Sequence, residues 1–198
     1  IRSYAESFFK PNGVVRLGVG RAGNVIGGGD WADDRIVADC MRAAASGKMV
    51  SLRKPLATRP WQHVLEPLSG YLALAMNLAN DPKLHAEPFN FGPPANQNHP
   101  VEKLVSVMST FWDQIRWEDV STYDSGPNEA SLLKLNCDKA LHHLKWYAAW
   151  DFEATIRETA LWYKNYYATD SQDISEFSIS QILSYTMTAR DRGLVWAK

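Results

Sequence analysis

The segment with the clearest chemical potential runs from Arg21 to Trp31 and reads RAGNVIGGGDW. It combines three consecutive glycines with Asn24, whose carboxamide can donate hydrogen bonds to a ligand. The mostly apolar residues 14–19 before it predict a short buried strand. Open α/β sheets hold ligands in loops at the carboxyl ends of their strands, so this segment indicates a ligand-binding loop. A plain flexible loop is the alternative that the glycines alone leave open.

A second glycine pattern overlaps this segment. Gly18, Gly20 and Gly23 fit the spacing G-x-G-x-x-G, which is typical of dinucleotide binding. That function requires a helix to begin within the glycines, so that its N-terminal amides meet a pyrophosphate. Here the glycines lie inside the expected strand, and residues 24–26 followed by three more glycines are not a helix start. We therefore do not expect these glycines to form a phosphate-binding turn.

Composition limits the class of protein. With 198 residues, 45% of them hydrophobic, the chain can form one large domain or one and a fraction. The net charge of −1 gives no reason to expect a nucleic-acid partner, and no apolar run has the length of a membrane span. Cys40 and Cys137 are not at disulfide-framework spacing, which favours a reducing, cytoplasmic location. No metal is expected, because ligand spacing is absent around the histidines, which are His63, His85, His99, His142 and His143.

The chain begins at Ile1 without a methionine, and residues 2–9 have the pattern of the last two turns of a helix. Residues 11–13, Pro-Asn-Gly, then break that helix. A short isolated helix is only marginally stable in water, so a domain seldom begins with one. We therefore expect the sequence to be the C-terminal portion of a longer protein.

Helices and short strands alternate along the rest of the chain. Asp33 and Asp34 are expected to cap a helix over 36–44 that Gly47 ends. Further helices are expected from Glu66-Pro67 to Asp81-Pro82 and over 101–112, 138–144 and 151–167, with strands over 50–52, 88–94, 115–120 and 132–135. The buried side of the helix after Glu66 is expected to consist of its large apolar residues, namely Leu68, Tyr71, Leu72, Ala75, Met76 and Leu78.

The motifs together resemble the extended short-chain dehydrogenase/reductase family of nucleotide-sugar enzymes, and within it the C-terminal part of the 4,6-dehydratases. The resemblance covers nearly everything from Ile1 to about Ile182. The block Arg59–Leu72 and the Gly-Gly-Gly-Asp-Trp loop are its most specific parts. The matching segments are Arg21–Trp31, Asp34–Val37, Arg59–Leu72, Phe89–Pro93, Leu133–Ala140 and Glu176–Ile179.

The resemblance implies an α/β fold that is the C-terminal portion of an extended Rossmann-type enzyme. The last strands of the Rossmann sheet would be joined to a mostly helical substrate-binding domain with short strands. Residues 1–32 would end the NAD-binding domain, and residues 33–168 would form the nucleotide-sugar-binding domain with interleaved Rossmann elements. Independently of the resemblance, the weaker periodicity after Ala168 predicts that residues 169–198 are a C-terminal tail that packs on the body or on a second subunit.

The activity implied for the full-length protein is NAD-dependent dehydration of CDP-glucose to CDP-4-keto-6-deoxyglucose in deoxysugar biosynthesis, as for lipopolysaccharide O-antigens. The family's catalytic Tyr-x-x-x-Lys pair lies outside this chain, so no catalytic residue is assigned and the chain alone is expected to be inactive. The substrate would be CDP-glucose or a related nucleotide sugar, and the full-length protein a homo-oligomer. A 4-epimerase or reductase of the same superfamily, or a non-catalytic nucleotide-sugar-binding fragment, are the alternatives.

Two polar residues match the family's contacts to the charged part of the substrate. Arg59 matches an arginine that meets the pyrophosphate, for which a planar cation is well suited. Asn24 matches a donor to the substrate phosphate near the nicotinamide, and with its neighbour Val25 it is assigned to the NAD site. Without the resemblance, Arg59 reads as a surface arginine in an ion pair and Asn24 as a loop residue.

The remaining matches concern the nucleoside and the phosphates. Arg35, Ile36 and Val37 match a segment that wraps the ribose and base, although the two aliphatic residues alone would read as ordinary helix core. Asn90 matches a polar position that faces the phosphates after a short strand.

Overall fold

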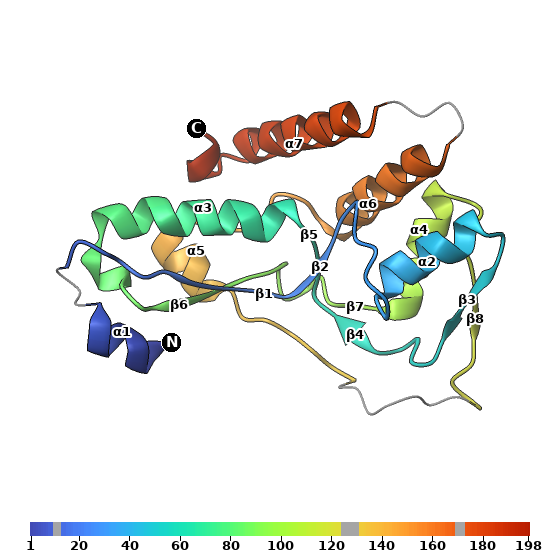
Figure 1. Cartoon of the computed structure of the whole chain (residues 1–198), viewed down its shortest axis with the longest axis horizontal. Helices are drawn as coiled ribbons and strands as arrows, with labels where there is room; N and C mark the ends of the chain where they lie inside the picture. Colours follow the sequence, from blue (N-terminus) through green and yellow to red (C-terminus); the bar gives the residue numbers. More distant parts are fainter. Residues whose placement is uncertain (10–12, 124–130, 169–172) are drawn as a thin grey trace.

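A computed structural model describes residues 1–9, 13–123, 131–168 and 173–198, and it is an α/β structure (Figure 1). The helices are α1 (Arg2–Phe8), α2 (Ile36–Ala45), α3 (Leu65–Asn80), α4 (Val101–Phe111), α5 (Asp138–Leu144), α6 (Phe152–Tyr167) and α7 (Ile174–Asp191), with 3-10 turns η1 (Pro82–Leu84) and η2 (Val195–Ala197). The strands are β1 (Val19–Ala22), β2 (Asn24–Ile26), β3 (Met49–Leu52), β4 (Thr58–Arg59), β5 (Trp61–His63), β6 (Pro88–Phe91), β7 (His99–Pro100) and β8 (Arg116–Asp119).

Each strand pairs with one partner far away in the sequence. Strands β1 and β6, β2 and β5, and β3 and β8 pair in parallel, whereas β4 and β7 pair antiparallel. Consecutive strands β1 and β2 therefore hydrogen-bond to different partners, although only Gly23 separates them. The chain passes from one ladder to the next at that glycine, and the candidate site is built around this passage.

The first strand begins later than the sequence indicates. Residues 14–18 are not a strand, because their hydrogen bonds go elsewhere. The Arg16 guanidinium donates to the carbonyls of Leu78 and Ala79 at the end of α3, both at 2.7 Å, and the backbone amide of Leu17 donates to His85 Nδ1 at 3.2 Å. This stretch thus caps the C-terminal end of α3, and strand pairing starts only at Val19.

The glycines of the G-x-G-x-x-G pattern serve packing. A Cβ atom on Gly20 would lie 2.6 Å from Cε1 of Tyr71, and one on Gly18 would lie 3.2 Å from Cδ2 of Leu74. Both neighbours belong to α3, so the glycines allow that helix to lie close to β1. Strand β2 follows Gly23 and no helix begins among the three glycines, as predicted.

The apolar side predicted for α3 is largely wrong. Leu72 and Met76 are 62% and 56% exposed, and Leu68 and Tyr71 are exposed as well, so that only Leu78 of the six predicted residues is buried. The buried face consists mainly of Glu66, Pro67, Ser69, Gly70, Ala73 and Leu74. A Cβ atom on Gly70 would lie 2.3 Å from the ring of Phe91. Small residues therefore face β6 because the helix sits too close for larger ones.

The start of α2 also differs from expectation. Its N-cap is Arg35, and no side chain caps it. Asp34 has a positive φ of 59°, and Asp33 instead forms an exposed ion pair with Arg42 at 3.3 Å. The two acids thus belong to the turn before the helix, while Gly47, with φ of 67°, follows the helix end as predicted.

Other elements are confirmed. Helices α4, α5 and α6 begin and end within a residue of their predicted bounds, and Leu104, Val105 and Met108 are the buried residues of α4. The strand predicted over residues 132–135 is wrong, because these residues form only an isolated bridge between Thr58 and Leu132. Beyond Ala168 the described part of the tail contains the 18-residue helix α7, which packs on α6 (Figure 1).

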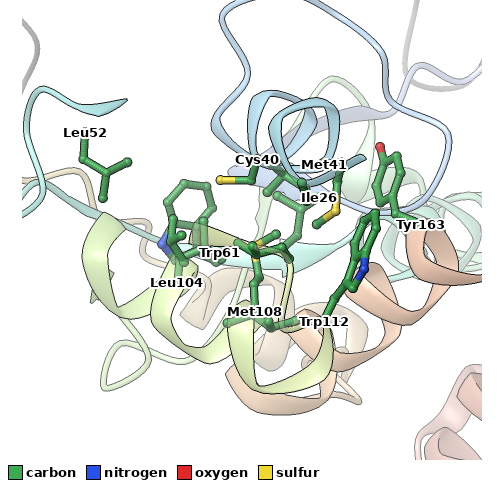
Figure 2. Packing of buried hydrophobic residues seen from close by; sticks show 14 of the residues in the cluster. Ile26, Cys40, Met41, Leu52, Trp61, Leu104, Met108, Trp112 and Tyr163 are labelled. Carbon is green, nitrogen blue, oxygen red and sulfur yellow. The ribbon is translucent and has the colours of Figure 1, made fainter. Parts of the chain in front are cut away.

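The largest hydrophobic cluster joins α2, α4 and α6 to β2 and β5. Figure 2 shows Ile26, Met41, Trp61, Met108 and Tyr163 pointing into the same interior. A second cluster lies between α3, α5 and β6, and a third holds the end of α7. In the described parts of the chain we find no helix with the length and apolar character needed to span a membrane.

Candidate functional site

The candidate site lies where the parallel strands β1 and β6 end. The Gly23 amide donates to the Phe91 carbonyl at 3.4 Å, so the carboxyl ends of these strands lie side by side. Asn24 follows at once and opens β2. Carboxyl ends of parallel strands are the usual ligand position in open α/β sheets. The structure therefore places Asn24 at the edge where such a sheet binds ligands.

Two glycines let another segment cross these strand ends. A Cβ atom on Gly23 would lie 2.8 Å from Cδ1 of Leu135, and one on Gly92 would lie 3.1 Å from the same atom. The Asn90 side-chain amide donates to the carbonyl of Asn136 at 2.9 Å. Asn90 thus fastens the segment around Leu135 to the end of β6, which is a structural contact at the position predicted to face phosphates.

Arg59 reaches the same region from a different strand. It is half-buried in β4, which lies between β7 and the segment 131–133. One nitrogen of its guanidinium donates to the Thr58 carbonyl at 2.9 Å. Two residues later Trp61 is the direct strand partner of Asn24. The backbone therefore places Arg59 two residues before the strand partner of Asn24, and the intervening Pro60 lies against Gly23, whose Cβ would be 3.3 Å from Cγ of Pro60.

Gln62 is a buried polar residue at this junction that the sequence interpretation missed. It is 1% exposed and pairs in register with Val25. Its Nε2 donates to the Phe91 carbonyl at 2.8 Å, while within the described residues its Oε1 has no hydrogen-bond partner. A buried acceptor without a donor is costly, so Gln62 Oε1 is a candidate contact for a ligand group. No alternation of apolar and polar residues marks Gln62 as buried, because its neighbours in β5 are Trp61 and the polar His63.

His63 and Glu66 continue the buried polar region toward α3. His63 is 3% exposed, and burial lowers its pKa to about 4. Its Nδ1 accepts from the Leu65 amide at 3.3 Å, which makes Nε2 the protonated nitrogen, and within the described residues Nε2 has no acceptor. Glu66 is fully buried, and burial raises the pKa of its carboxyl to about 7.

The carboxyl of Glu66 joins three parts of the chain. It accepts from the backbone amides of Ala149 and Trp150 at 2.9 and 2.7 Å, and from the Tyr185 hydroxyl at 2.8 Å. Ser69 in turn contacts the Tyr185 hydroxyl at 2.9 Å. These contacts hold α7 and the segment before α6 against α3, so the role of Glu66 is to fix the architecture behind the site.

The triple-glycine loop is packed against α6. A Cβ atom on Gly28 would lie 2.0 Å from the Trp162 indole, and Gly29 has a φ of 80°. The Tyr163 hydroxyl donates to the Asp30 carbonyl at 2.6 Å, and burial raises the pKa of Tyr163 to about 12. Trp31 meets the Tyr163 ring edge-on at 5.1 Å. In the described structure, the lack of a side chain at Gly28 therefore makes room for the Trp162 indole.

The three residues predicted to contact the nucleoside lie at the start of α2 and differ in how exposed they are. The Val37 side chain is 5% exposed and belongs to the largest core cluster, and Ile36 packs against that cluster. Arg35, at the N-cap, is exposed. Of these three residues, Arg35 is thus the one whose side chain is open to a ligand. Val25, predicted near the cofactor, is 36% exposed.

A cavity of about 380 Å³ is lined by other residues. It is next to the carboxyl ends of β3 and β8, which end at Leu52 and Asp119. Its walls are Arg53, Lys54, Pro55, Leu56, Ala57, Glu102, Asp119, Ser121 and Ser131. It contains two cationic and two acidic residues and none of the predicted site residues. No group of three His, Cys, Asp or Glu side chains suited to a metal ion occurs within the described ranges.

Comparison with known proteins relates this arrangement to nucleotide-sugar enzymes. No protein-family model matches the chain. The chain is 40% identical over 190 residues to CDP-glucose 4,6-dehydratase of Salmonella typhimurium, and the match covers 93% of this chain and 52% of that protein. The chain thus spans about half the length of this curated relative. The similarity agrees with the resemblance noted from the sequence motifs.

Solved structures of the same class share the fold. UDP-glucuronic acid 4-epimerase from Bacillus cereus, solved with UDP-glucuronic acid and NAD, has a TM-score of 0.68 at 14% identity, with 83% of this chain and 49% of that chain covered. UDP-glucose-4-epimerase from Stenotrophomonas maltophila, with NAD, has 0.69 at 15%, covering 82% and 52%. dTDP-Glucose 4,6-dehydratase from Bacillus anthracis, with NAD, has 0.60 at 19%, covering 82% and 47%. The chain therefore has the extended Rossmann-type fold of these enzymes over about half of their length.

Proposed function

We propose that this chain supplies the substrate-binding part of a nucleotide-sugar 4,6-dehydratase that acts on CDP-glucose. The observation that carries the proposal is the junction beside the carboxyl ends of β1 and β6, where Asn24 pairs with Trp61 and Arg59 lies two residues before that partner. The 40% identity to a CDP-glucose 4,6-dehydratase supports the choice of nucleotide and reaction.

In this proposal Arg59 binds the pyrophosphate of the nucleotide sugar. A guanidinium offers a planar pair of N–H donors that matches two phosphate oxygens, and its charge persists at every physiological pH. Asn24 would donate a neutral hydrogen bond from the start of β2, and Arg35 would add an exposed cation at the start of α2. Val37 contributes by packing, since its side chain is in the core.

The proposed cofactor is NAD. When bound, NAD would accept a hydride from the sugar and later return it to the sugar. The residues of this chain could contact only the edge of the NAD site. Asn24, Val25 and the unpaired Oε1 of Gln62 lie at the ends of the strands, whereas Gly18, Gly20 and Gly23 pack against α3, Pro60 and Leu135. The chain would therefore orient the sugar nucleotide beside the cofactor, where a misplacement of about 1 Å can cost roughly a hundredfold in rate.

Calorimetric titration of the 198-residue chain with CDP-glucose, CDP, UDP-glucose and NAD tests the proposal. We expect CDP and CDP-glucose to bind, NAD alone to bind weakly or not at all, and no turnover of CDP-glucose with NAD. Absence of binding by every nucleotide would refute the proposed role. Stronger binding of UDP-glucose than of CDP-glucose would instead favour an epimerase, the activity that two of the structural relatives carry.

A further inference from the structure

Helix α7 has one face that anchors it to the protein. Gln181, Tyr185 and Ala189 are its buried residues, spaced four apart. The Gln181 amide donates to the Glu158 carbonyl at 2.7 Å, and the Tyr185 hydroxyl donates to Glu66 at 2.8 Å. The orientation of α7 on the body is therefore fixed by specific contacts, and its opposite face points away from α6 and α3.

That opposite face is apolar and uncovered in the described structure. Ile179, Leu183 and Met187 are 57%, 58% and 62% exposed. They follow one another at four-residue spacing, so they form a single stripe along the helix. In Figure 1, α7 lies along the upper edge of the molecule, with the rest of the protein on one side of it. Such a stripe is the kind of surface that a second helix covers.

The charges of the stripe are arranged symmetrically about its centre. Glu176 lies seven residues before Leu183, and Arg190 lies seven residues after it. Seven residues are nearly two helical turns, so both charged groups lie on the same face as Leu183. Ile179 and Met187 are likewise four residues before and after the centre. Glu176 and Arg190 are both exposed, and Arg190 is held by a hydrogen bond from its Nε to the Ala197 carbonyl at 3.2 Å.

We propose that α7 pairs antiparallel with α7 of a second copy of this chain, with the two-fold axis passing at Leu183. In this arrangement Leu183 packs on its own symmetry mate, Ile179 packs on Met187 of the other copy, and Glu176 meets Arg190 of the other copy. The ion pair forms twice, once at each end of the apolar contact. The self-complementarity of a two-fold interface requires this kind of arrangement.

The charge order favours this pairing over others. A parallel pairing in register would place Glu176 beside Glu176 and Arg190 beside Arg190, which is repulsive. A partner without a matching charge pattern would leave both end charges unpaired against its surface. The stripe is short, so the pair of helices alone is expected to give a weak and reversible dimer.

Charge reversal tests the proposed register. Sedimentation equilibrium on the 198-residue chain should show a monomer–dimer equilibrium. Glu176→Arg and Arg190→Glu should each weaken the dimer about tenfold, because each creates two like-charged contacts. The double variant Glu176→Arg/Arg190→Glu should return the dimer to near wild-type strength, since it restores both ion pairs with the signs exchanged. Thermal melts of the four proteins check that folding is unchanged.

A cysteine placed on the axis provides an independent test. Leu183→Cys should form a disulfide-linked dimer rapidly under mild oxidation, because the two sulfurs would face each other across the two-fold axis. Ser184→Cys is the matched control, since residue 184 is also exposed but lies on the flank of the helix, away from the axis. A monomer at all concentrations, a double variant that stays as weak as the single ones, or equal cross-linking at 183 and 184 would overturn the proposal.

Discussion

At the scale of single residues, Glu66 and His63 show how burial sets both protonation and stability. Glu66 favours its neutral form in the folded protein, because burial raises its pKa from 4.5 to about 7. Its contribution to the free energy of unfolding is therefore fully present below about pH 4.5 and is lost as the pH rises through 7. His63 acts oppositely: its folded pKa of about 4 lies below the ordinary 6.5, so its contribution is lost as the pH falls from 6.5 through 4.

The Glu66→Gln variant separates the pH dependence of stability that Glu66 causes from the opposite pH dependence that His63 causes. The glutamine keeps the shape and an acceptor oxygen but cannot ionise. We expect the unfolding free energy of the wild type, relative to Glu66→Gln, to fall by about 3 kcal/mol between pH 4.5 and pH 7.5. Urea unfolding of both proteins at the two pH values measures this difference. A difference that stays constant or rises with pH would show that the carboxyl is charged in the folded protein.

The residues of the site were only partly predictable. Arg59 and Asn24 could be proposed from motif resemblance, and the strand register then pairs Asn24 with Trp61, two residues after Arg59. Gln62 and Glu66 were missed, because a glutamine in a short strand and a glutamate at a helix start normally face water. Their burial depends on Phe91, Ala149 and Trp150, which are distant in sequence, and no local pattern encodes these contacts.

At the scale of elements, the contact between the triple-glycine loop and α6 yields a second stability prediction. Gly28→Ala places a methyl group into the Trp162 indole, and such overpacking costs about 1–3 kcal/mol of unfolding free energy. In a Trp162→Ala background the same substitution should cost markedly less, since the obstructing ring is gone. Denaturant unfolding of the four proteins gives the coupling. Equal costs in both backgrounds would contradict the packing.

The spacing of apolar residues predicted some of these helices correctly and others wrongly. It located α4 and α6 and the buried face of α4, because those helices have one apolar side. It selected the wrong face of α3, which has apolar residues all round. There Gly70 and Ala73 are buried because Phe91 requires a close approach, while Leu72 and Met76 remain exposed. Helix α7 was missed because serine and threonine alternate with its apolar residues.

At the scale of the whole molecule, the chain is an assembly of two-stranded ladders held by helices from distant parts of the sequence. It spans about half the length of its relatives. The fold of this half alone therefore does not establish a complete enzymatic activity. The fold class could be predicted because the motif blocks occur in a characteristic order. The pairing of β1 with β6 and of β2 with β5 could not, since register depends on packing across the entire chain.

The most direct test of the central claim is the affinity of the 198-residue chain for CDP-glucose with and without the Arg59 guanidinium. Calorimetry should show that Arg59→Ala binds roughly 10- to 100-fold more weakly than the wild type, because a charge-assisted hydrogen bond to phosphate is lost. Arg157→Ala, which removes an exposed arginine paired with Glu158 on α6, should bind like the wild type. An Arg59→Ala variant that keeps wild-type affinity would contradict the account.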